Sequence, residues 1–149
     1  MKLYNYKIVR EKSETYYDGR KSLNTPTEAA KMFREFCEES YDLDKEHFSV
    51  IMVDTKNKVI GINLVSIGTV NQTLVHPREV FRPAVMASAN SVFVCHNHPS
   101  GDPTPSREDV TITKRLVEAG KMLGIEVLDH VILGDKRHTS LRELGHIEG

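Results

Sequence analysis

Residues 91–134 carry the pattern that most constrains the fold of this chain. The apolar segment SVFVC leads into a loop with three prolines and a glycine, and SREDVTITKRLVEAGKML follows as a well-marked helix. One face of that helix is apolar at helical spacing, through Ile112, Leu116, Ala119 and Leu123. Gly124 is placed to end the helix, and EVLDHVILG returns as a second buried strand. Strands interleaved with helices in this way predict a layered α/β domain.

The segment 25–40 predicts a further helix with a strong start signal. Thr25 can be its N-cap, Pro26 fits the first helical position, and Glu28 completes a capping box. Apolar residues recur on one face of this segment, so the helix is expected to dock on the rest of the domain. They are Ala29, Met32, Phe33, Phe36 and Cys37.

Between these two regions the pattern predicts a hairpin and another helix. Segments 47–54 and 59–70 flank a polar turn and together indicate two antiparallel strands. Residues 77–90 look helical, although Pro83 removes an amide that a helix interior needs and is expected to kink it. Two short strands at 3–9 and 14–17 and a helical turn in the last nine residues complete the expected elements.

The composition is that of an ordinary globular protein. With 149 residues the chain is most simply one domain, and 20 basic against 21 acidic side chains give no general attraction to nucleic acid or membrane. The N-terminus lacks the apolar core of a signal peptide, and no run approaches the about 18 apolar residues of a membrane span. Cys37 and Cys95 show no disulfide-like spacing, so a reducing cytoplasm is the expected location.

The end of SVFVC carries the candidate chemistry. Residues two apart on a strand share a face, so His96 and His98 point to the same side and Cys95 to the other. Asp109 lies on the first turn of the next helix, where the proline-rich loop can bring its carboxylate to the same point. Two imidazoles, one carboxylate and a water form a four-coordinate zinc site of the catalytic type. The alternative is structural, since Ser106 and Asp109 also fit a capping box that merely starts the helix.

The segment HNHPSGDPTPSRED resembles the JAMM (MPN+) metalloprotease motif, in which H-x-H is followed by seven residues and S-x-x-D. The flanking segments VHPREVFRPAVMASANSVFVC and GIEVLDHVILGD look more narrowly like the bacterial RadC-like branch. The resemblance begins near Asn24 and is most specific over residues 68–135. We therefore expect an MPN domain over 24–149 and an N-terminal extension over 1–23. The helix-hairpin-helix-like region of longer RadC proteins is missing, so the resemblance suggests a stand-alone domain.

The resemblance implies a layered α-β-α MPN/JAB (cytidine-deaminase-like) fold with a central mixed sheet. It implies one catalytic Zn²⁺ held by His96, His98 and Asp109, with Ser106 as a hydrogen-bond donor to the reacting oxygen. The family also uses an upstream glutamate as general acid/base, and Glu46 stands in that position. Glu79 is the alternative, although in the first helical turn of its segment it can be a favourable helix-start charge.

These features predict a zinc-dependent hydrolase acting through a zinc-bound water, a metallopeptidase or isopeptidase with a polypeptide substrate. Asn97 replaces the Ser or Thr that ubiquitin-cleaving members carry between the two histidines, which argues against eukaryotic-type isopeptidase activity. The alternatives are a DNA-repair-associated protein that uses the zinc fold as an interaction module, and a nuclease, which the near-neutral charge disfavours. His130 is read as a core histidine, with contact to a metal ligand as the second option.

Overall fold

The computed structural model describes residues 1–3, 22–40, 43–71 and 74–148. The strands expected at 3–9 and 14–17 fall outside this part of the chain, apart from Leu3. In the described part, five strands form one sheet in the order β2-β1-β3-β4-β5. Their bounds are His47–Val53 for β1, Val59–Ile67 for β2, Ser91–Asn97 for β3, Glu126–Leu133 for β4 and His138–Ser140 for β5.

The sheet is mixed, as expected. Strand β1 is antiparallel to both β2 and β3, β3 and β4 are parallel, and β5 is antiparallel to β4. The β1–β2 pair is the predicted hairpin. Every residue of β1 and β3 is buried, which is why both strands read as nearly continuous apolar runs: helices cover the two faces of a central strand.

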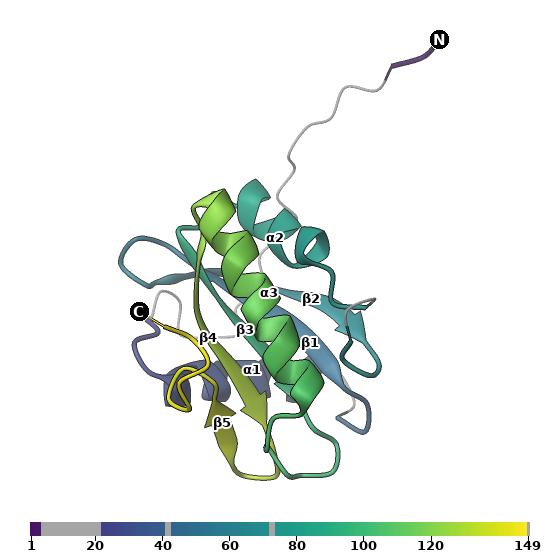
Figure 1. Ribbon diagram of the computed structural model, residues 1–149, viewed down its shortest axis with the longest axis vertical. Helices are drawn as coiled ribbons and strands as arrows, with labels where there is room; N and C mark the ends of the chain where they lie inside the picture. Colours follow the sequence, from purple (N-terminus) through teal and green to yellow (C-terminus); the bar gives the residue numbers. More distant parts are fainter. Residues whose placement is uncertain (4–21, 41–42, 72–73, 149) are drawn as a thin grey trace.

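Helices cover both faces of the sheet. Helix α1 (Pro26–Ser40) lies against one face, and α2 (Pro77–Met86) and α3 (Arg107–Leu123) lie against the other (Figure 1). The core is accordingly divided in two. One cluster joins α1 to the sheet through residues such as Phe33 and Ile51. The other joins α2 and α3 to it through residues such as Phe81 and Leu116. The predicted α-β-α layering is confirmed.

The residues predicted to begin α1 and to end α3 do so in the structure. The amide of Glu28 donates to Thr25 Oγ1 at 3.2 Å, so Thr25 caps α1. Gly124 ends α3 in the left-handed conformation at φ 72°, which a residue without a Cβ adopts at no steric cost. Of the apolar face expected on α3, Ile112 and Leu116 are buried, whereas Leu123 is 52% exposed because the helix runs past the edge of the core.

Two local features differ from the expectations: the end of α2 and the presence of β5. Helix α2 continues through Pro83 but ends at Met86, before the end of the predicted segment. The short helical turn expected in the last residues is present, with the Leu144 amide donating to the Ser140 carbonyl at 3.2 Å. Strand β5 was not expected, because three residues give no detectable alternation, and its pairing with Val131–Leu133 of β4 defines it. None of the helices among the described residues has the length and apolar content that crossing a bilayer requires.

Candidate metal centre

His96, His98 and Asp109 meet where β3 ends and α3 begins. The Nε2 atoms of the two histidines are 3.0 Å apart, and Asp109 approaches His96 through Oδ1 at 3.2 Å and His98 through Oδ2 at 3.1 Å. Ligands about 2.0–2.1 Å from one tetrahedral ion stand roughly 3.3 Å apart. The three side chains therefore already have the mutual spacing of ligands to a single metal ion, and they form a group that could hold one.

The proline-rich loop between β3 and α3 sets this arrangement. The amide of His98 donates to the Leu133 carbonyl at the end of β4, and the Asp135 amide donates to the Gly101 carbonyl, both at 2.8 Å. Gly101 itself has φ 90°, a conformation that favours glycine. The loop is thus attached to the end of β4 on both sides of its turn, which fixes the position of His98 relative to β3.

Ser106 and Asp109 form the predicted capping box. Ser106 Oγ accepts from the Asp109 amide at 3.0 Å, and the Ser106 amide donates to Asp109 Oδ2 at 2.8 Å. The cap orients the Asp109 carboxylate, which is 3% exposed, toward the two histidines. The helix-starting and ligand-like interpretations of this residue are therefore compatible. The capping bond uses a lone pair of the Ser106 hydroxyl and leaves its O–H as a donor.

The charges at the centre favour an ionised carboxylate. Burial opposes ionisation of Asp109, but its close contacts with His96 and His98 outweigh burial and lower the pKa of this carboxyl. The hydrogen bond to Asp109 raises the pKa of His98, against its partial burial, and the Asp102 carbonyl and the charge of Glu46 act in the same direction as Asp109. The site combines one carboxylate with two imidazole rings, a set of metal ligands that suits a divalent transition-metal cation.

Glu46 lies directly before β1, close enough for its charge to act on His98. Its carboxylate Oε2 accepts from the Val70 amide at 2.8 Å, and its carbonyl accepts from the Gly68 amide at 2.8 Å. The side chain is half-buried. The chain that follows β2 thus holds the Glu46 carboxylate in a defined position, from which its charge acts on His98.

Asn97 secures the segment that carries Glu46. Its Oδ1 accepts from the His47 amide at 2.7 Å, and its Nδ2 donates to the Lys45 carbonyl at 2.9 Å and to the Leu43 carbonyl at 3.3 Å. The residue between the two histidines therefore binds the backbone on both sides of Glu46. Sequence reasoning noted Asn97 only as a difference from other family members.

Glu79 has different surroundings. It lies in the first turn of α2, where its Oε1 contacts Arg82 Nη2 at 3.0 Å and Arg78 Nε at 4.0 Å. Its side chain is 43% exposed. These are the contacts of a surface charge at a helix start, in agreement with the structural alternative considered for this residue.

His130 contacts a candidate ligand, which the sequence interpretation ranked second. Its Nε2 is 2.7 Å from Nδ1 of His96, and its Nδ1 is 2.5 Å from Thr113 Oγ1. Burial of the ring, followed by repulsion from His96, lowers the pKa of His130 well below its usual value. His130 pairs with Val94 in the β3–β4 register, so its side chain emerges on the same face as that of His96. Knowledge that these strands are neighbours would have revealed the contact.

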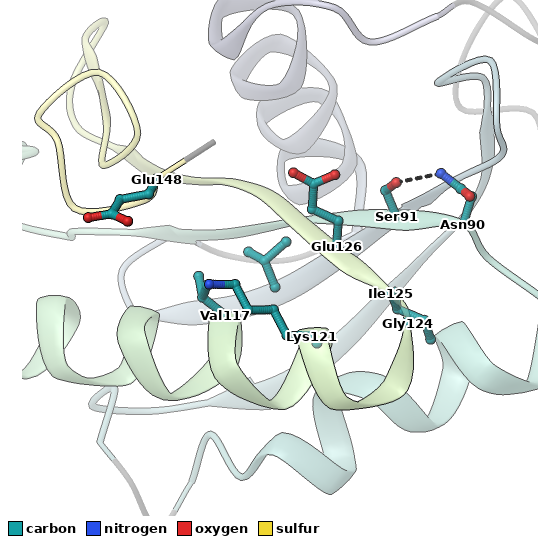
Figure 2. A pocket seen from close by; sticks show the side chains of 10 residues that line it. Asn90, Ser91, Val117, Lys121, Gly124, Ile125, Glu126 and Glu148 are labelled. Atoms are coloured by element: carbon teal, nitrogen blue, oxygen red, sulfur yellow. Dashed lines mark hydrogen bonds between the residues drawn. The ribbon is translucent and has the colours of Figure 1, made fainter.

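A cavity among the described residues lies away from the histidine and aspartate group. It has a volume of about 270 Å³ and is lined by residues such as Asn90, Ser91, Lys121 and Glu126 (Figure 2). These residues mark the beginnings of β3 and β4 and the end of α3. The histidine and aspartate group lies at the opposite ends of β3 and α3, so this cavity is separate from it.

The absence of a side chain at Gly134 allows the proline-rich loop to pack closely against the end of β4. A Cβ at Gly134 would lie 2.4 Å from the Gly101 carbonyl oxygen and 2.6 Å from Pro103 Cδ. We expect Gly134→Ala to displace the loop and to destabilise the fold by about 1–3 kcal/mol, and to weaken metal binding because His98 moves with it. Thermal unfolding and zinc titration measure the two effects.

The matched control is Gly61→Ala, whose added Cβ would meet only the flexible end of Met52, at 3.0 Å. It should change zinc affinity little. Equal zinc affinities for Gly134→Ala and Gly61→Ala would show that the close approach at Gly134 does not position the loop.

A family model and individual relatives both match this chain. The family model described as RadC-like JAB domain matches residues 23–146. The chain is 55% identical over 127 residues to a UPF0758 protein of Caldanaerobacter subterraneus subsp. tengcongensis, covering 85% of this chain and 53% of that protein. It is 48% identical over 142 residues to a UPF0758 protein of Bacillus cereus, covering 95% and 62%. The chain thus spans less than two thirds of the length of these relatives. It belongs to the RadC-like JAB-domain family.

Proposed function

We propose that this chain is a zinc-dependent hydrolase that cleaves amide bonds in a polypeptide, as a metallopeptidase or isopeptidase. The observation that carries the proposal is the group formed by His96, His98 and Asp109, which offers three ligand atoms where a tetrahedral zinc ion takes four. Two imidazoles and a carboxylate are a donor set that Zn²⁺ accepts in catalytic sites. Membership of the JAB-domain family is compatible with a hydrolase.

Zn²⁺ bound by these residues would supply an acidified water and polarise the carbonyl of the scissile amide. Glu46 would serve as the general base and acid that carries a proton to the leaving amine, a role that the effect of its charge on His98 supports. The Ser106 hydroxyl, whose hydrogen is not used by the capping bond, donates to the developing negative charge on the oxygen. The Asp109 carboxylate stays ionised throughout.

Cleavage of a defined peptide mixture tests the proposal. Purified protein is stripped with a chelator, reloaded with one equivalent of Zn²⁺, and incubated with peptides from a digested proteome that are then identified by mass spectrometry. We expect new peptide termini with the zinc-loaded protein and none with the stripped protein. Cleavage that is equally fast without metal would contradict zinc dependence.

The same preparation distinguishes the alternatives. Zinc-dependent nicking of supercoiled plasmid, without peptide cleavage, would indicate a nuclease, against the near balance of 20 basic and 21 acidic side chains. Stoichiometric zinc with neither activity would favour an interaction module, including one associated with DNA repair. A cytoplasmic location is part of the proposal, supported by two buried free cysteines, Cys37 and Cys95, as expected in a reducing compartment.

A further inference from the structure

A chain of hydrogen bonds between buried polar groups connects two residues of the candidate metal centre, His96 and Asp109. His96 Nδ1 lies 2.7 Å from His130 Nε2, and His130 Nδ1 lies 2.5 Å from Thr113 Oγ1. Thr113 Oγ1 in turn donates to the backbone carbonyl of Asp109 at 2.7 Å. His96, His130 and Thr113 are all completely buried. The chain therefore begins and ends on residues that belong to the candidate site, with no route for water to replace one of its bonds.

The end of this chain fixes the direction of every hydrogen bond in it. The Asp109 carbonyl can only accept, so the single hydroxyl hydrogen of Thr113 goes to it. Thr113 Oγ1 must then accept from His130, which places a hydrogen on Nδ1 of that ring. With one hydrogen on His130, its Nε2 accepts from Nδ1–H of His96. The reverse direction would set two acceptors, Thr113 Oγ1 and the Asp109 carbonyl, against each other at 2.7 Å.

We propose that His130 and Thr113 are positioning residues that hold His96 in the tautomer needed for metal binding. With its hydrogen on Nδ1, His96 presents an unprotonated Nε2 to His98 and Asp109. His98 is held in the same tautomer by one hydrogen bond: its Nδ1 is 2.8 Å from the Asp102 carbonyl, which can only accept. The ring of Phe48 stacks on His96 at 5.9 Å and meets His130 edge-on at 5.5 Å, which restricts both rings. This inference rests on the proposed zinc site.

Substitutions at Thr113 test it with little change in shape. Thr113→Val keeps the volume but removes the acceptor for His130, so that ring can take the opposite tautomer and donate to His96. We expect the dissociation constant for Zn²⁺, measured by competition with a chelating dye, to rise about 10–100-fold. Thr113→Ser keeps the hydroxyl and should stay within about threefold of the original protein, well below the range expected when the partner is lost.

Thr111→Val is the matched control. Thr111 is exposed in the same helix and makes the same kind of bond, from Oγ1 to the Arg107 carbonyl at 3.0 Å. Its loss should leave zinc affinity unchanged. Equal zinc affinity in Thr113→Val and Thr111→Val, or a Thr113→Ser protein as weak as Thr113→Val, would overturn the inference.

A second measurement reads the tautomers without metal. Long-range proton–nitrogen NMR spectra of the metal-free protein, at a pH where imidazoles are neutral, assign which ring nitrogen carries the hydrogen. We expect Nδ1–H on both His96 and His130 in the original protein. Nε2–H on His130 would overturn the inference even if zinc binds. The expected tautomers in a protein that binds no zinc would refute the proposed function and the role in metal binding, and would leave only the assigned hydrogen-bond directions standing.

Discussion

Replacement of His98 by alanine is expected to remove zinc from the protein. The original chain should carry about one Zn²⁺ after purification, and His98→Ala much less than a tenth of that, because two remaining ligands do not complete a tetrahedral site. His98 is the ligand whose loss disturbs the fold least, since its side chain is 13% exposed whereas His96 has none of its side chain exposed. Metal content by mass spectrometry of the purified proteins measures the effect.

The control for this experiment is His146→Ala. His146 lies in the C-terminal turns and is not one of the candidate ligands, so its loss should leave the metal content at the original level. A His98→Ala protein that folds and still carries one zinc would show that the metal binds elsewhere. A normal melting curve for the variant separates ligand loss from unfolding.

Replacement of Glu46 by glutamine is expected to abolish hydrolysis while zinc stays bound. The amide keeps the shape of the side chain and can still accept the bond from the Val70 amide, so the surrounding loop should not move. It cannot accept a proton at neutral pH, and the loss of a general base costs about 10²–10⁴-fold in rate. Peptide cleavage and metal content are measured on the same preparation.

Glu79→Gln is the matched control, because Glu79 is the other candidate base. Its contacts with Arg82 and Arg78 lie on the surface of α2, so cleavage should continue at the original rate. Undiminished cleavage by Glu46→Gln would refute the role of Glu46. Loss of cleavage in Glu79→Gln alone would assign the base to Glu79.

The central group was predictable from the sequence because its geometry is local. His96 and His98 are separated by one residue at a strand end, which puts them on one face. A capping box, which the segment SRED predicts, orients Asp109 toward them. Strand periodicity, a loop of restricted conformation and a helix cap are all short-range effects, so no knowledge of the sheet order was required.

The supporting contacts were not predictable, because each of them crosses the sheet. Asn97 binds the backbone around Glu46 only because β1 lies beside β3, some 50 residues away in sequence. His130 meets His96 only because β4 is the other neighbour of β3. Sequence patterns identified these strands but not their order. The choice between Glu46 and Glu79 was open for the same reason.

The hydrogen bonds of Asn97 have a consequence for how the family can vary. Because one side chain joins the end of β3 to the start of β1, the ligand-bearing and glutamate-bearing segments are linked directly. The turn between β1 and β2 lies at the far end of the hairpin and takes no part in this link. Insertions there can lengthen the hairpin without altering the spacing between the Glu46 carboxylate and the candidate ligands. The fold thus separates the part that must stay constant from the part that is free to diversify.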